Sequence, residues 1–162
     1  MTSRITTVLA LAASTFLFAC SEEPATSDTQ VSAIEALADE YLAAVLERNP
    51  QMGTQLGIAG ARHDRLFDNS LGALAEWQER EDAWFARLNA IPEPNEVGSR
   101  DWISYGILHE ELGTSIALRL CRNELWQASG STGWHRGLPF LFEIQPVETA
   151  DQRQQTLERL SR

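Results

Sequence analysis

Lysine is missing from this sequence of 162 residues, so each of its 13 strong cations is an arginine. Asp and Glu together number 23, which leaves a formal net charge of −10 spread along the chain. Proteins that bind nucleic acid need basic side chains clustered on one face to neutralise phosphates. The dispersed acidic balance of this chain therefore argues against nucleic acid as a partner.

Long apolar runs are also scarce. The most apolar stretch, residues 8–19, is too short for a permanent transmembrane helix, which needs about 20 apolar residues. Arg4 provides a short positive region before it. This combination is typical of a secretory signal peptide, so we expect residues 1–19 to be removed on export.

The end of that signal, Leu17-Phe18-Ala19-Cys20, resembles the bacterial lipobox. The resemblance implies that the signal is cut before Cys20 and that Cys20 receives lipid and attaches the protein to a membrane. Ser21 is similar to the pattern sorted to the outer membrane, so we expect a cell-envelope protein facing the periplasm. The alternative is an ordinary signal peptide cut nearby, with Cys20 incidental. Residues 20–30 are polar and without periodicity, as in a flexible tether.

Cysteine is rare as well, because Cys121 is the only one besides Cys20. A single free cysteine is more often buried than reactive. We therefore expect Cys121 to be a small residue packed on a helix rather than a reactive or metal-bound thiol.

Strand-type alternation is missing from residues 31–162, where apolar residues recur at helical spacing instead. Helices are predicted over residues 31–49, 50–56, about 70–90, 100 to about 126, and from 149 onward. The expected N-terminal caps are Asn49, Ser70 or Asp68, Ser99, and a capping box of Thr149 with Gln152. We predict an all-α domain, an irregular bundle of about five helices, with Trp77, Trp84 and Trp102 in its core.

Glycine and proline interrupt the helical pattern in residues 121–151, where aromatic residues also gather. We interpret this stretch as a loop region that joins the third long helix to the last. Within it, Trp134, His135 and Arg136 are candidates to line a groove, since Arg favours planar partners such as carboxylates. The alternative is a packed loop whose aromatic rings fill a gap in the core.

Motifs for catalysis or metal binding are missing. A zinc-peptidase helix needs a second His four residues after the first, but the residue in that position after His109-Glu110 is Gly113. Gly130 to Gly133 lacks the spacing and the Lys of a phosphate-binding loop. We predict no catalytic residue, no metal ligand and no cofactor in this chain.

Several short segments, in their order and spacing, resemble the N-terminal part of the bacterial domain-of-unknown-function family 885, over residues 36–159. They are Tyr41-Leu42, Asn49-Pro50, Leu56-Gly57 with Gly60 and Asp64, Leu108-x-x-Glu111-Leu112, Leu125-Trp126, Gly137-Leu138-Pro139, Gln145-Pro146, Thr149 and Leu157-x-Arg159-Leu160. The resemblance implies an exported lipoprotein of all-helical fold, related to zinc carboxypeptidases. It also implies that the zinc-binding segment belongs to a C-terminal half absent from this sequence, so no family site residue carries over.

The resemblance therefore implies a fragment, a truncated gene product or one half of a split protein. We expect the N-terminal portion of a lipid-anchored, zinc metallopeptidase-like protein, inactive by itself, whose partner is the missing C-terminal half. This portion would form one wall of the substrate groove. The alternative is a short non-enzymatic lipoprotein of the cell envelope that binds a partner or ligand.

Overall fold

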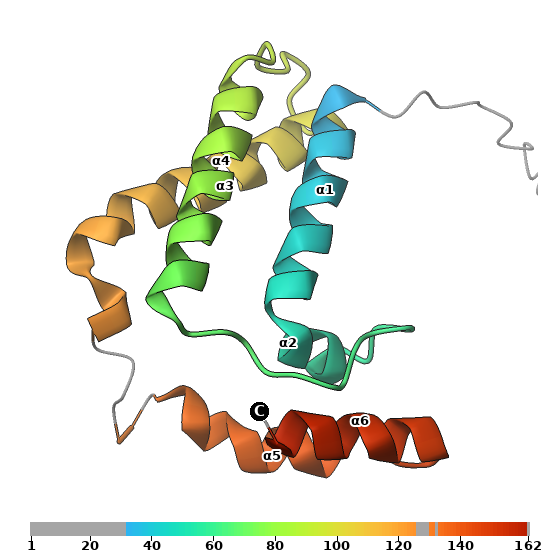
Figure 1. The fold of residues 1–162 in the computed structure, drawn as a ribbon. Coiled ribbons are helices and arrows are strands. Elements are labelled where there is room, and N and C mark those ends of the chain that lie inside the picture. Colours follow the sequence, from blue (N-terminus) through green and yellow to red (C-terminus); the bar gives the residue numbers. More distant parts are fainter. Residues whose placement is uncertain (1–31, 126–129, 132, 162) are drawn as a thin grey trace, which may run out of the picture. The chain divides into compact units, whose positions relative to one another are not determined.

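The computed structural model of the chain describes residues 32–125, 130–131 and 133–161. These residues belong to one unit of the fold, which spans Val31–Arg162. Every regular element in the described residues is a helix, as Figure 1 shows. The predicted all-α fold class is therefore confirmed.

The described α-helices are α1 (Ala33–Arg48), α2 (Pro50–Gln55), α3 (Leu71–Asn89), α4 (Arg100–Leu118), α5 (Leu138–Ile144) and α6 (Ala150–Ser161). Three short 3₁₀ helices lie between α4 and α5, namely η1 (Arg119–Cys121), η2 (Asn123–Leu125) and η3 (Trp134–Gly137). No helix among the described residues is long and apolar enough to cross a membrane.

Serine starts each of the three longest helices. Ser32, Ser70 and Ser99 adopt extended backbone angles, which turn the chain into α1, α3 and α4. Each hydroxyl oxygen accepts a hydrogen bond from the backbone N–H three residues later, at 3.0, 3.2 and 3.2 Å. Of the two caps considered for α3, Ser70 is the one used, and Asp68 accepts a bond from the N–H of Ser70.

The helix ends follow local chemistry with one exception. The capping box of α6 is present: Thr149 N–H donates to Gln152 Oε1 at 2.9 Å, and Gln152 N–H donates to Thr149 Oγ1 at 3.2 Å. After α2 comes Gly57, whose φ of 63° is the left-handed conformation expected there. The predicted Asn49 cap of α2 is wrong, because its side chain donates to Val45 O at 2.8 Å and closes α1 instead.

Helices α1, α3 and α4 surround the apolar core. Its buried residues are Leu37, Ala44, Trp77, Trp84, Leu88, Leu108 and Leu112. Trp84 is packed edge-on between Tyr41 and Trp77, with ring centroids 5.3 and 5.4 Å away. The prediction that Trp77 and Trp84 are core residues is confirmed. The prediction for Trp102 is wrong, because Trp102 lies on the exposed side of α4.

Residues 121–151 contain more helix than predicted. Helix α4 ends at Leu118 rather than near residue 126, because η1 tightens the chain and Arg122 then takes a left-handed φ of 49°. Cys121 lies in this turn and is exposed, so the prediction that it is packed is wrong. Helix α5 forms where a loop was predicted, since Pro139 sits in its first turn and needs no intrahelical N–H bond there.

Candidate functional site

Arg159, a cation of α6, is the charged side chain that the fold buries most deeply, with only 1% of its surface exposed. Its Nε donates to Arg65 O at 2.9 Å, and its Nη2 donates to Arg62 O at 3.2 Å. Its Nη1 donates to Gln145 Oε1 at 2.7 Å, and both terminal nitrogens donate to Thr54 Oγ1 at 3.2 Å. A buried charge is tolerated only when its donors are satisfied. These bonds therefore join α6 to α2, α5 and the loop of residues 56–69.

The hydrogen-bond partners of Arg159 in the described residues are all neutral oxygens. Burial lowers the pKa of the Arg159 guanidinium, and the charge of nearby Asp64 acts in the opposite direction. Because arginine stays protonated in proteins, the site keeps a positive charge that oxygen dipoles and Asp64 stabilise.

Gln145 and His63 extend this set of contacts. Gln145 Nε2 donates to His63 O at 3.1 Å and to Thr156 Oγ1 at 2.7 Å, while Gln155 Oε1 accepts from His63 N–H at 3.1 Å. Thr54 Oγ1 lies 2.8 Å from His63 Nδ1. Nδ1 of a neutral imidazole accepts from this hydroxyl or donates to it according to the tautomer, and the hydroxyl also donates to Pro50 O at 3.5 Å. We call Thr54, His63, Gln145, Gln155, Thr156 and Arg159 the Arg159 network.

Electrostatics favour the same neutral form of His63. Burial is the main cause that lowers the pKa of His63, and the positive charge of Arg159 lowers it further. The carboxylate of Asp64 acts in the opposite direction. The network therefore assembles with His63 uncharged.

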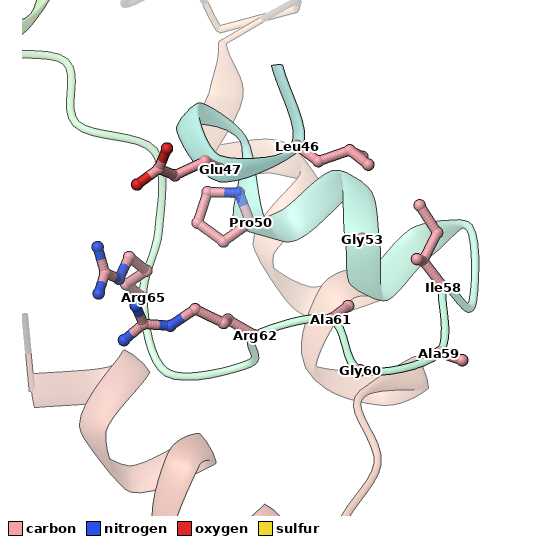
Figure 2. Close-up of a pocket in the computed structure, with 10 residues that line it drawn as sticks. All are labelled: Leu46, Glu47, Pro50, Gly53, Ile58, Ala59, Gly60, Ala61, Arg62 and Arg65. Atoms are coloured by element: carbon pink, nitrogen blue, oxygen red, sulfur yellow. The ribbon is translucent and has the colours of Figure 1, made fainter. Parts of the chain in front are cut away.

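Arg62 and Arg65, whose carbonyl oxygens Arg159 holds, also line a pocket of about 280 Å³ (Figure 2). Its lining is Leu46, Glu47, Pro50, Gly53, Ile58, Ala59, Gly60, Ala61, Arg62 and Arg65. In Figure 2 the charged groups gather on one side, away from Ile58 and Ala59. Gly53 is needed here, since a Cβ on it would lie 2.8 Å from the Cβ of Ala61. We call this the arginine pocket.

Asp64 sets the charge balance of the arginine pocket. Its buried carboxylate accepts two hydrogen bonds from Arg62, Nε to Oδ1 at 3.1 Å and Nη2 to Oδ2 at 2.5 Å, and these lower the pKa of Asp64. Arg65 Nε lies 3.7 Å from Asp64 Oδ1, beyond hydrogen-bond distance. That nitrogen is buried and has no hydrogen-bond partner in the described residues. Arg65 Nε therefore forms an ion pair with Asp64 without a hydrogen bond.

The arginine pocket combines apolar side chains with two guanidinium groups, those of Arg62 and Arg65, and with the carboxylate of Glu47. Arg62 is paired with Asp64. An apolar lining with a few polar groups suits a small molecule that has an apolar body and a polar end.

A zinc site does not fit the described residues, because no group of three or more His, Cys, Asp or Glu side chains among them is placed to hold a metal ion. His109 packs on aromatic rings instead, 5.3 Å from Phe85 and 6.0 Å from Tyr105 between centroids. Glu110 and Glu111 are exposed on the solvated face of α4.

The predicted groove residues follow one another in η3. The side chain of Trp134 is outside the part that the structure describes, and His135 is exposed. Arg136 is also exposed, and its Nη1 donates to Gly130 O at 2.6 Å within the same loop region. Their role in lining a groove stays a prediction.

A comparison with protein families identifies the family of this chain. The model of the family described as bacterial protein of unknown function (DUF885) matches residues 50–162. This chain belongs to that family. Among the curated proteins, none matches. The match begins at the first residue of α2 and includes the Arg159 network and the lining of the arginine pocket except Leu46 and Glu47.

Several residues that carried the family resemblance meet in this site of the DUF885 chain. Asp64, Gln145 and Arg159 are buried polar residues, and Gly60 lines the arginine pocket. Helical periodicity does not single out Arg159, because Leu157 and Leu160 are the apolar positions of α6. The available signal was the position of three polar residues inside family-like segments.

Proposed function

We propose that this chain is the lipid-anchored N-terminal portion of a zinc metallopeptidase-like protein and is inactive by itself. Cys20 carries the lipid, and the protein is exported to the cell envelope, on the outer membrane and facing the periplasm. Helices α5 and α6 form the contact with the C-terminal portion. Family membership supports the coarse part of this proposal, and the surface of α6 supports the contact.

The observation that carries the proposal is the inverted character of α6. Leu157 and Leu160 are 62% and 61% exposed, while Arg159 between them is buried. The two leucines are three positions apart, so they lie on one side of the helix. An amphipathic helix of a globular protein normally turns that side toward a core. Phe140 of α5 and Val147 after it are exposed as well, which enlarges the apolar area offered to a partner.

Zinc, in this proposal, is bound by the C-terminal portion. The described residues offer no ligand set for it, so no catalytic step is assigned to them. Their contribution is structural: the Arg159 network fixes α6 while its leucines face outward.

A hydrophobic dye tests the proposed contact. The chain from Cys20 to Arg162 should bind such a dye, and the double substitution Leu157→Gln with Leu160→Gln should reduce the bound dye several-fold. The matched control is Leu42→Gln, an exposed leucine of α1, which should leave most of the dye bound. Equal dye binding by both variants would show that the apolar surface that binds the dye lies elsewhere, and it would contradict the proposal.

Lipid attachment is tested separately, because the proposed attachment point is a single residue, Cys20. Cells that express the chain are labelled with palmitate, and the label should appear on the wild-type protein. Substitution Cys20→Ala should abolish it. Unchanged labelling of this variant would contradict lipid attachment at Cys20 and would leave the proposed role of α6 unaffected.

The second candidate function is a non-enzymatic lipoprotein that binds a small molecule in the arginine pocket. The two guanidinium groups in the lining of the arginine pocket, those of Arg62 and Arg65, favour it. Calorimetric titration with hexanoate should then give saturable binding that Arg65→Gln removes and Arg80→Gln, on α3, does not. The genomic sequence after Arg162 separates the two functions: a helical continuation with a His-Glu zinc segment supports the first, and an unrelated gene supports the second.

A further inference from the structure

Helix α4 is apolar on two opposite sides. One side carries Leu108 and Leu112, which are buried in the core. On the other, Trp102, Ile103 and Ile107 are 40%, 46% and 64% exposed. With about 100° of rotation per residue, Ile103 lies opposite the two buried leucines, and Trp102 and Ile107 lie on either side of it. We call Trp102, Ile103 and Ile107 the outer α4 face.

The outer α4 face distinguishes α4 from α3. Helix α3 has the same length, 19 residues, and turns exposed Glu76, Glu79 and Asp82 to solvent, as a one-sided helix normally does. Along α4 the apolar residues give way to Glu110, whose carboxylate accepts a bond from the hydroxyl of Thr114 at 3.1 Å. The outer α4 face therefore covers only the first two turns of the helix.

The part of the chain that the structure describes begins at Ser32, beside the first turn of α4. Ser32 Oγ, just before α1, donates to Asp101 Oδ1 at 2.7 Å, and Arg100 forms an ion pair with Glu35. These contacts hold the start of α1 beside the first turn of α4, as can be followed in Figure 1. They also place the ion pair of Arg100 and Glu35 beside the first turn of α4, while exposed Glu110 and Glu111 follow the outer α4 face along the helix.

We propose that the outer α4 face docks on the surface of the lipid bilayer that holds the protein. This inference rests on the lipid anchor at Cys20 proposed above. At most about 3.5 Å per residue, the segment between Cys20 and Ser32 reaches no further than about 40 Å. Attachment therefore keeps the face at a high local concentration near the bilayer. Tryptophan favours the lipid–water interface, and an apolar face of this kind lies shallowly in it.

The size of the face favours a bilayer over a protein. Three partly exposed side chains offer far less than the about 800 Å² that each partner contributes to a stable protein interface. A weak apolar contact is sufficient for a surface to which the chain is already attached.

The test couples the chain to vesicles chemically, so that it does not depend on lipidation in cells. The chain from Cys20 to Arg162, with exposed Cys121→Ser, is attached through Cys20 to a maleimide lipid in phosphatidylcholine vesicles. Brominated acyl chains, which quench nearby indoles, should lower the tryptophan emission compared with unbrominated vesicles. Trp102→Phe should remove most of this quenching.

The docking variant is Ile103→Glu with Ile107→Glu, which should abolish the quenching while the chain remains coupled. The matched control is Leu71→Glu, an exposed leucine at the first position of α3, where an acidic residue suits the helix dipole. This control should be quenched like the wild type. Circular dichroism of both variants checks that the helices persist.

Three results would overturn the proposal. They are an absence of quenching in the coupled wild type, quenching that persists in the Ile103→Glu, Ile107→Glu variant, and a dimer in solution that this variant converts to a monomer. The last would identify a second copy as the occupant of the face. A wild-type protein that takes up no palmitate in cells is a separate outcome, because it refutes the anchor and not the affinity of the face for lipid.

Discussion

Helices α1, α3 and α4 are joined by apolar and aromatic side chains, whereas α2, α5 and α6 meet largely through the polar Arg159 network. In the first region, Trp84 and its ring neighbours fill the space between helices. In the second, one guanidinium supplies donors to two side chains and two backbone carbonyls. The two regions thus gain stability from different interactions.

The difference explains why the leucines of α6 remain outside. Apolar packing is non-directional, so it orients a helix by placing its apolar side inward. Hydrogen bonds are directional, and the bonds of Arg159 fix which side of α6 is buried. A region held in this way keeps its leucines available for a partner, while the α1–α3–α4 core has used most of its own.

The largest expected effect lies in the apolar region. Trp84→Ala should lower the free energy of unfolding by about 3–5 kcal/mol, because it leaves a large cavity in the core. It also removes the hydrogen bond from Trp84 Nε1 to Glu40 Oε1 at 2.8 Å. Urea unfolding followed by circular dichroism measures this. Trp102→Ala, at an exposed tryptophan of α4, is the control and should cost under about 1 kcal/mol.

Arg159→Met should produce the next largest effect and confine it to the polar region. Each buried acceptor that loses its donor costs about 1–3 kcal/mol, so we expect a total of about 3 kcal/mol. Arg153→Met removes an exposed arginine of the same helix and should cost under about 1 kcal/mol. Equal stability of the two variants would show that the network does not hold α6.

Acidification should separate the two regions by a smaller effect. The pKa of His63 lies below its usual 6.5 in the folded chain, so the unfolded chain binds this proton more readily. Stability of the polar region is therefore lost progressively as the pH falls below 6.5. The hydrogen bonds from Arg87 and Trp84 lower the pKa of Glu40 from 4.5 to about 2, so its link between α1 and α3 weakens only below pH 4.5.

Circular dichroism during a pH titration checks this order of events. A partial loss of helix should appear between pH 6.5 and 4.5, and His63→Gln should remove it. Glu40→Gln is the matched control, since it should alter only the transition below pH 4.5. A single step common to both variants would contradict the separation of the two regions.

Local features of this fold were predictable from the sequence. The caps at Ser70, Ser99 and Thr149 involve bonds to residues only three positions away, so spacing alone reveals them. Trp77 and Trp84 were correctly placed in the core by helical periodicity. The fold class follows from the same periodicity, since no strand pattern competes with it.

The candidate site was not predictable in the same way. Thr54 and Arg159 are 105 positions apart, and no local pattern links a threonine to a distant arginine. Periodicity weighs apolar character only, so it gives no sign that α6 turns Arg159 inward and leaves Leu157 and Leu160 exposed. Pro139 favoured the prediction of a loop where α5 forms, although proline is compatible with a first helical turn.

Hydrogen exchange followed by mass spectrometry tests most directly whether the Arg159 network alone holds the polar region. In the Arg159→Met variant, we predict that amides of α6, α5 and residues 56–69 exchange much faster than in the wild type. The amides of α1, α3 and α4 should keep their protection, because their core is untouched. Uniform acceleration in all helices, or unchanged protection of α6, would contradict the account.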